Sequence, residues 1–271
     1  MFALCYDSFE YQVVSRMVLT VNIVVNEVSA SQPLRRNGFT FKQFFVAHDR
    51  CAMKVGTDGV LLGAWAPVEQ ATRILDIGSG SGLIALMLAQ RTSPSVVIDA
   101  VELDIPAADQ AKENFQASTW AERLNVFAQD INVVAQTHPA QYDLIVSNPP
   151  YFESAVACRD EARNTARYTE TLTHSALLQC AETLLMAQGL FCVVLPYDIG
   201  LALENDAHLQ GWFTSRRLAV RDRPGKALNR LLLFLSRQPA ETDSQELDLR
   251  EKEGVYSQAF RALIADFYLN Y

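Results

Sequence analysis

The feature that most constrains the fold is an apolar segment that runs directly into three evenly spaced glycines. Residues 74–83 read Ile-Leu-Asp-Ile-Gly-Ser-Gly-Ser-Gly-Leu, and a further apolar stretch follows. Glycine permits tight turns and lets the backbone approach a ligand closely, while the start of a helix offers unpaired N–H groups. The segment therefore predicts a buried strand, a ligand-binding loop and a helix. A plain turn is the alternative, because a glycine-rich loop alone is weak evidence.

Apolar segments and helical patterns alternate from residue 73 onward, as in βαβ units. The expected strands are 73–77, 96–102, 125–128, 143–147, 190–195, 215–220 and 228–235. Helices are expected at 82–91, 106–118 and 173–187. A further helix is expected within 255–271, where the apolar residues fit one helical face, and another is expected to start at Thr57 or Asp58, either of which can cap a helix. The pattern predicts an α/β class, Rossmann-like, seven-stranded doubly wound sheet, mostly parallel, with an antiparallel hairpin at one edge.

The chain divides by pattern into a flexible N-terminal extension (1–33), a substrate- and cofactor-flanking segment (34–68), the α/β core (69–239) and a C-terminal segment (240–271). Within the extension, residues 17–30 loosely imitate a secretory signal, but Asn22 interrupts the apolar run. A strand-like leader, or a true start at Met17, is the alternative that we favour.

Composition limits the setting in which the chain works. Its five cysteines are odd in number and scattered without zinc-binding spacing, which predicts reduced thiols in the cytoplasm and no metal site. No apolar stretch approaches the roughly 20 residues that a membrane helix needs. The net charge of −8 argues against a general nucleic-acid coat protein but allows a local basic face. We expect a monomer with no membrane partner.

Three acidic residues fall at or just past the ends of successive predicted strands. Asp76 would repel a pyrophosphate but suits the ammonium of a methionine moiety, and Glu102 is placed to accept hydrogen bonds from two ribose hydroxyls. Asp130 is placed to accept from an adenine amine. Leu83 stands where the dinucleotide fingerprint requires glycine or alanine, which disfavours NAD as the cofactor. The three acidic residues favour S-adenosylmethionine instead. The expected cofactor-binding residues are Thr57, Asp76, Gly78, Gly80, Gly82, Glu102, Asp130 and Asn148.

The sequence Asn148-Pro149-Pro150-Tyr151 follows another predicted strand where its carboxyl end should meet the cofactor crevice. The lone pair of an adenine or amide nitrogen is delocalised, so two acceptors aimed at its N–H bonds would favour the charge-developing state. The Asn148 side chain and the Pro149 carbonyl supply two such acceptors, held rigidly by consecutive prolines, and Tyr151 can stack on a planar substrate. A simple turn at the strand end is the alternative.

These segments resemble the class I amino-methyltransferases, in which D-x-G-x-G-x-G and N-P-P-[YF] bind the cofactor and the target nitrogen. Residues 34–44, 48–59 and 143–151 are similar, more closely, to the bacterial tRNA1(Val) adenine-37 N6-methyltransferase family. The resemblance extends from about residue 31 to the end. It implies methylation of N6 of the adenine beside the anticodon, with S-adenosylmethionine as cofactor and the tRNA anticodon stem-loop as partner.

Two basic segments, residues 34–56 and 216–230, offset the acidic total. Charge clustering favours phosphate contact for both, with intramolecular ion pairs as the alternative. A third group, at 159, 163 and 167, would share one helical face. The expected RNA contacts are Arg35, Arg36, Lys42, Arg50, Lys54, Arg167, Arg221 and Arg223.

Other acceptors and one other class stay open at this point. An rRNA guanine amine, a DNA adenine and a protein glutamine are alternative substrates for the same chemistry. The basic segments disfavour the protein, and the lack of a long target-recognition insert disfavours sequence-specific DNA. A nicotinamide oxidoreductase would need a different glycine spacing, and a non-catalytic RNA-binding module would bind no S-adenosylmethionine.

Overall fold

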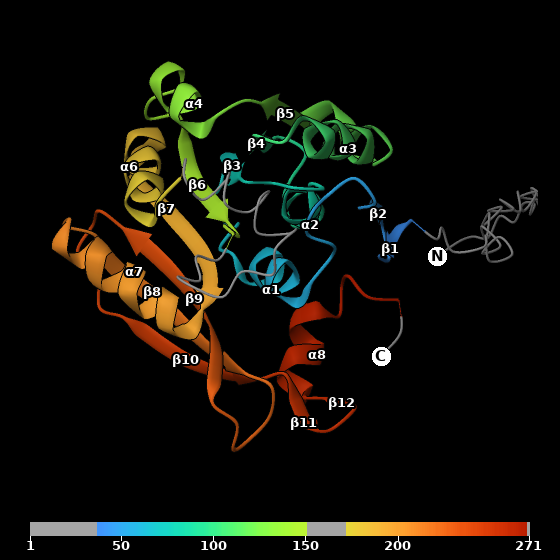
Figure 1. Ribbon diagram of the computed structural model, residues 1–271, viewed down its shortest axis with the longest axis vertical. Coiled ribbons are helices and arrows are strands. Elements are labelled where there is room, and N and C mark those ends of the chain that lie inside the picture. The colour runs from blue at the N-terminus through green and yellow to red at the C-terminus, as the bar shows by residue number, and fades with distance from the viewer. Residues whose placement is uncertain (1–36, 151–171, 270–271) are drawn as a thin grey trace, which may run out of the picture. The chain divides into compact units, whose positions relative to one another are not determined.

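The computed structural model describes residues 37–150 and 172–269, and within them an eight-stranded sheet forms the centre (Figure 1). The strand order is β10-β8-β9-β7-β6-β3-β4-β5. The strands are β3 Arg73–Ile77, β4 Val97–Glu102, β5 Leu124–Ala128, β6 Tyr142–Ser147, β7 Leu185–Pro196, β8 Phe213–Arg221, β9 Leu228–Ser236 and β10 Asp243–Asp248. Only β9 runs antiparallel to its neighbours. The carboxyl ends of all the other strands in this sheet therefore share one edge.

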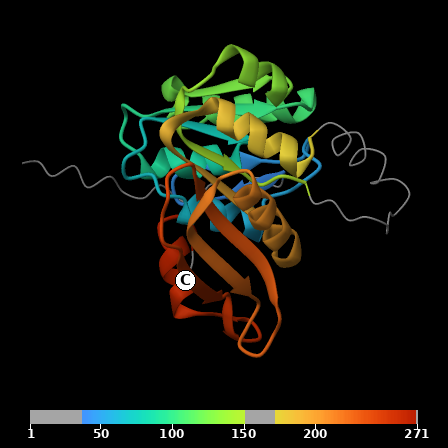
Figure 2. The same cartoon turned by 90° about the vertical axis from the view of Figure 1, so that its left-hand side faces the viewer.

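Helices cover both faces of the sheet. Alternate residues along the central strands explain this, because Ile74 and Leu144 belong to one buried apolar cluster while Leu75 and Ile145 belong to another. Side chains of α1, α2, α3 and α8 join the first cluster, and those of α4, α6 and α7 join the second; Figure 2 shows α6 and α7 in front of the sheet. The helices are α1 Thr57–Trp65, α2 Leu83–Arg91, α3 Ile105–Gln116, α4 Ile131–Thr137, α6 His174–Leu184, α7 Tyr197–Leu209 and α8 Gln258–Ile264.

Shorter elements complete the described chain. A 3-10 turn, η1, spans Ala121–Arg123, and two small antiparallel ladders pair β1 Gly38–Thr40 with β2 Phe45–Ala47 and β11 Arg250–Lys252 with β12 Val255–Tyr256. Phe41 and Phe44 share the first apolar cluster with Phe260 and Ile264 of α8. Lys42 binds the same C-terminal region, since its N–H donates to the carbonyl of Phe267 at 2.7 Å and its ammonium to that of Ala265 at 2.6 Å. The segments that flank the core in sequence are thus packed against it.

The α/β, mostly parallel sheet predicted from the sequence is confirmed, with one strand more than expected. β10 pairs in parallel with β8, so the β8–β9 hairpin is not the outermost pair. The helices α4 and α7 are also additional to those predicted, and β7 starts at Leu185, five residues earlier than expected. The helix α1 starts at Thr57 as predicted, but its N-cap is Gly56 and no side chain caps it.

None of the helices in the described ranges is long and apolar enough to span a bilayer. Residues 1–33, for which we expected a flexible extension, lie outside the described residues.

Candidate functional site

The glycine loop joins the carboxyl end of β3 to α2 and has the backbone that its sequence requires. Gly78, Gly80 and Gly82 have φ angles of +73°, +52° and +78°, a backbone region that residues with a side chain rarely adopt. A Cβ at Gly78 or Gly80 would meet no atom within 4 Å, so the space beside them is open. A Cβ at Gly82 would lie 2.4 Å from the ring of Phe115. The first two glycines leave room for a ligand, and the third permits close packing on α3.

Asp76 lies in β3, two residues before the loop, and is completely buried. Its Oδ2 accepts a hydrogen bond from the Ala85 N–H at 3.2 Å, whereas Oδ1 has no partner among the described residues. Burial raises the pKa of this carboxyl to about 7. A buried acceptor without a donor is costly, so the site suits a ligand that brings an N–H group, such as an ammonium.

Glu102 ends β4 and faces the same loop. One carboxylate oxygen accepts from the Gly80 N–H at 2.8 Å and the other from the Asp104 N–H at 2.9 Å. Burial raises the pKa of Glu102, although these two hydrogen bonds oppose the shift. Each oxygen keeps acceptor capacity beyond its one bond, which fits a pair of ribose hydroxyls.

Asp130 follows β5 and serves as the N-cap of α4. Its Oδ1 accepts from the backbone N–H and from the side-chain amide of Asn132, both at 2.8 Å. The structure thus gives this carboxylate a capping role. Its contact with an adenine amine stays a prediction.

The Asn-Pro-Pro segment lies directly beside the glycine loop. Strands β3 and β6 are neighbours in the sheet, and Ile77 pairs with Ser147, the residues that precede Gly78 and Asn148. The Ser147 hydroxyl donates to the Ile77 carbonyl at 2.9 Å, which ties the two strand ends together. Pro149 is buried, and the half-buried Asn148 has a side-chain oxygen with no partner among the described residues. Tyr151 lies outside the described residues.

Thr57 is exposed in the first turn of α1, close to the start of α2. Gly59 permits the close approach of α1 to the start of α2, because a Cβ at this position would lie only 3.0 Å from the Leu83 side chain. Asp58 accepts from the guanidinium of Arg230 in β9 at 2.8 Å. These contacts hold the first turn of α1 at the edge of the sheet where the glycine loop lies.

The basic residues expected to contact RNA differ in their surroundings. Arg50 pairs with Glu113 of α3, and Lys42 binds the carbonyl of Ala265. Lys54 is exposed, and no ion pair is seen for it within the described residues. Arg221 binds Glu246 at 2.9 Å and Asp248 at 2.5 Å, and Arg223 lies 3.6 Å from Glu253. Arg35, Arg36 and Arg167 lie outside the described residues.

The segment 216–230 therefore makes the intramolecular ion pairs that were its alternative interpretation. Arg216, Arg217 and Arg230 are also paired with carboxylates. Whether Arg221 and Arg223 contact RNA stays a prediction. No cluster of three or more metal-binding side chains occurs in the described part of the chain.

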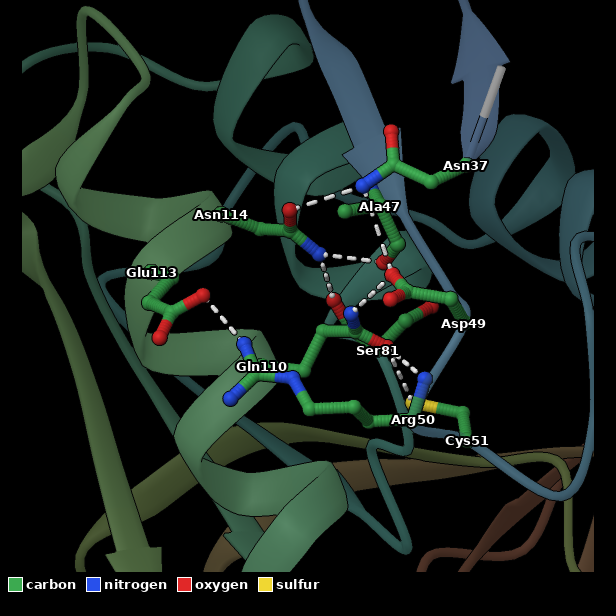
Figure 3. A network of polar contacts seen from close by, with 9 residues as sticks. All are labelled: Asn37, Ala47, Asp49, Arg50, Cys51, Ser81, Gln110, Glu113 and Asn114. Carbon is green, nitrogen blue, oxygen red and sulfur yellow. Dashed lines mark hydrogen bonds and ion pairs between the residues drawn. The ribbon is translucent and has the colours of Figure 1, made fainter. Parts of the chain in front are cut away.

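Two amide side chains near the loop were not anticipated from the sequence. Gln110 of α3 binds the segment that follows β2, and Asn114 binds Ala47 at the end of β2 and Ser81 in the glycine loop (Figure 3). Their spacing of four residues places both on one helical face, which is the signal that could have found them.

Comparison with known proteins gives the family. The family model described as Methyltransferase small domain matches residues 55–201, which contain the glycine loop and the Asn-Pro-Pro segment. A protein of Yersinia enterocolitica named tRNA1(Val) (adenine(37)-N6)-methyltransferase is 66% identical over 238 residues, covering 88% of this chain and 95% of that protein. The chain belongs to this methyltransferase family. A protein of the same name from Yersinia pseudotuberculosis is 64% identical over 248 residues, covering 91% of this chain and 98% of its own length.

A solved structure agrees with the fold. A predicted O-methyltransferase from Agrobacterium tumefaciens superposes with a TM-score of 0.61 at 16% identity, covering 78% of this chain and 96% of the other. The cofactor of the protein whose sequence is given above is S-adenosylmethionine, as the sequence predicted. The open space beside Gly78 and Gly80, the Asp76 oxygen that has no partner in the described part of the chain and the remaining acceptor capacity of Glu102 fit that group.

Proposed function

We propose that this protein methylates N6 of adenine 37 in tRNA1(Val). The names of its relatives at 66% and 64% identity support this substrate. The observation that carries the chemistry is the side-chain oxygen of Asn148, which has no hydrogen-bond partner among the described residues and lies one residue beyond the strand end that is tied to the glycine loop. In this proposal, it accepts a hydrogen bond from the target amine where that amine meets the cofactor.

The cofactor-binding residues have separable roles in this proposal. Asp76 binds the ammonium of the methionine moiety, Glu102 binds the ribose hydroxyls and the loop glycines leave the backbone open to the ligand. Thr57, Asp130 and Asn148 complete the set, at the first turn of α1, at the cap of α4 and just past the end of β6. The cofactor supplies an electrophilic methyl group on a sulfonium.

Asn148 and Pro149 act on the acceptor nitrogen. In an adenine amine, the nitrogen lone pair is delocalised into the ring. Hydrogen bonds from its two N–H groups to the Asn148 side chain and the Pro149 carbonyl strengthen as positive charge develops on nitrogen, so they stabilise the transition state selectively. Pro150 restricts the preceding backbone, and Tyr151 stacks on the base. The methylated ammonium is acidic enough to lose its proton without a dedicated base.

The RNA is held, in this proposal, by the basic residues that flank the site. These are Arg35, Arg36, Lys42, Arg50, Lys54, Arg167, Arg221 and Arg223. For Arg221 and Arg223, phosphate contact requires exchange of their carboxylate partners. An anticodon-loop adenine is unpaired, which avoids much of the cost of extracting a base from a duplex.

We propose that the protein acts as a monomer in the cytoplasm, in keeping with the free thiols of Cys51, Cys180 and Cys192.

The substitution Asn148→Ala tests the role of this residue. With labelled S-adenosylmethionine and unmodified tRNA1(Val), kcat should fall by roughly 10²–10³-fold, the cost of removing one aimed hydrogen-bond partner. Affinity for S-adenosylhomocysteine should fall far less than kcat, because Asn148 is only one of the eight residues expected to bind the cofactor. The matched control is Asn205→Ala, on the exposed surface of α7, which should leave both quantities unchanged.

Two outcomes would contradict the proposal. Unchanged turnover in Asn148→Ala would remove the assigned role of the amide. Equal methylation of a transcript that carries guanine in place of adenine 37 would remove the assigned substrate. Mass spectrometry of the digested nucleosides identifies the product as N6-methyladenosine or as another methylated base.

A further inference from the structure

Helix α3 contacts two parts of the cofactor side of the site, Glu102 and the glycine loop. Its N-cap, Asp104, donates its backbone N–H to Glu102 at 2.9 Å. At its other end, the ring of Phe115 fills the space next to Gly82, at 2.4 Å from where a Cβ would be. The helix therefore spans from the carboxylate that faces the glycine loop to the last glycine of that loop.

Asn114 joins the same helix to the glycine loop and to β2. Its amide N–H groups donate to the carbonyls of Ser81 and Ala47, both at 2.8 Å, and its oxygen accepts from the Ala47 N–H at 3.0 Å. The amide thus pairs with Ala47 as a second strand would. Asn114 is only 5% exposed, so losing these partners would leave buried backbone groups unpaired.

Gln110 lies one turn earlier on the same face and holds the next residues of the chain. Its oxygen accepts from the Arg50 N–H at 3.0 Å and from the Cys51 thiol at 3.2 Å, while its amide donates to Asp49 at 2.8 Å. Figure 3 shows both amides pointing from α3 into this segment. The guanidinium of Arg50 also pairs with Glu113 of α3.

We propose that Gln110 and Asn114 are positioning residues that couple tRNA binding to cofactor binding. This inference rests on the proposed function, since residues 47–54 carry Arg50 and Lys54, two of the proposed RNA contacts. Asn114 transmits a shift of that segment directly to Ser81 in the glycine loop. Gln110 transmits it to α3, whose ends contact Glu102 and Gly82. One bound ligand therefore orders part of the site of the other.

Such coupling is reciprocal, and typical values correspond to an affinity change of about 5–150-fold. We expect tRNA1(Val) to tighten the binding of S-adenosylhomocysteine to the wild-type protein by about tenfold, at the lower end of that range. The ratio of the two dissociation constants, without and with tRNA, measures the coupling. A role limited to folding would change stability but leave this ratio unchanged.

The substitution Gln110→Met keeps the length of the side chain and removes its hydrogen bonds. The coupling ratio should fall below about threefold, whereas affinity for S-adenosylhomocysteine alone should stay within about twofold, because Gln110 does not touch the glycine loop. The matched control is Gln238→Met, which follows β9 and whose amide donates to the main-chain carbonyl of Ala187 at 3.0 Å, at the edge of the sheet opposite the glycine loop. It should retain the wild-type ratio.

A second variant, Asn114→Leu, separates the two links. It should weaken the binding of S-adenosylhomocysteine alone and also reduce the ratio, since Asn114 touches Ser81. Calorimetric titrations with and without unmodified tRNA1(Val) give all the constants, and thermal melts verify folding. A ratio near one in the wild type, an unchanged ratio in Gln110→Met, or an equal fall in Gln238→Met would overturn the inference. Absence of methyl transfer by the wild type would instead overturn the proposed function.

Discussion

At the scale of single residues, the burial of Asp76 destabilises the ligand-free protein near neutral pH and provides a binding site for a cationic ligand. Its pKa rises from an ordinary value of 3.8 to about 7 because it is buried, so the folded protein binds a proton that the unfolded chain releases. The stabilising effect of this proton is complete below pH 3.8 and is lost as the pH rises through about 7. A bound ammonium would lower the pKa again and displace the proton.

The substitution Asp76→Asn should therefore stabilise the ligand-free protein at pH 8 and weaken cofactor binding. The gain should approach roughly 4 kcal/mol at pH 8, the free energy that corresponds to this difference in pKa, and vanish near pH 4. Urea unfolding at both pH values measures it. In the wild type, the affinity for S-adenosylhomocysteine should rise between pH 6 and pH 7.5 with release of protons. Equal stability of the two proteins at pH 8 would contradict this account of Asp76.

At the scale of elements, the packing of α2 on α3 depends on Gly82. Both Gly82 and Gly225 have a φ of +78°, but only Gly82 faces the ring of Phe115; Gly225 has no atom within 4 Å of its Cβ position. We expect Gly225→Ala to lower the free energy of unfolding by about 1 kcal/mol, through backbone strain alone. Gly82→Ala should cost roughly 1–3 kcal/mol more, as overpacking does, and should weaken cofactor binding. Denaturant titration compares the two; equal losses would mean that Phe115 moves aside freely.

The same scale shows how far the sequence predicts the fold. Strands such as β3 and β6 are buried on both faces, so adjacent residues along them are apolar instead of alternating with polar ones, and glycine or proline follows each strand. In β10, by contrast, only Leu247 is buried, and no apolar alternation marks the strand. The helix α7 carries Gly200 in its first turns, and glycine weakens a helical sequence pattern. Tertiary packing requires this glycine, because the Leu231 side chain lies 2.9 Å from its Cβ position. Edge position and tertiary packing decided these elements.

The candidate site was predicted unevenly for a related reason. The glycine loop and the strand-end acids have characteristic spacing, and the sheet brings them to one edge. Gln110 and Asn114 instead resemble solvent-facing polar residues of an amphipathic helix, since the residues they bind lie 33 to 67 positions away in the sequence. The ion pairs of Arg221 and Arg223 also join residues that are distant in sequence. Local sequence does not specify such partners.

At the scale of the whole molecule, a net charge of −8 must be reconciled with binding a polyanion. The structure pairs all five arginines of the 216–230 segment with carboxylates, whereas Lys54 is exposed. An arginine that must leave a carboxylate to reach a phosphate gains little net attraction. We therefore expect Lys54 to contribute more to the attraction of tRNA than the paired arginines of the 216–230 segment.

The salt dependence of tRNA binding tests this distribution of charge. The logarithm of the association constant should fall linearly with the logarithm of salt concentration, by about 0.7–0.9 for each phosphate contact. Lys54→Ala should reduce the slope by about one such contact, whereas Arg223→Ala should reduce it by less than half as much, because Glu253 already neutralises Arg223. Fluorescence titration of labelled tRNA1(Val) between 50 and 200 mM salt, roughly the range in which such slopes are resolved, compares the variants. A larger effect of Arg223→Ala would show that the 216–230 segment exchanges its carboxylates for phosphates and forms the main RNA surface.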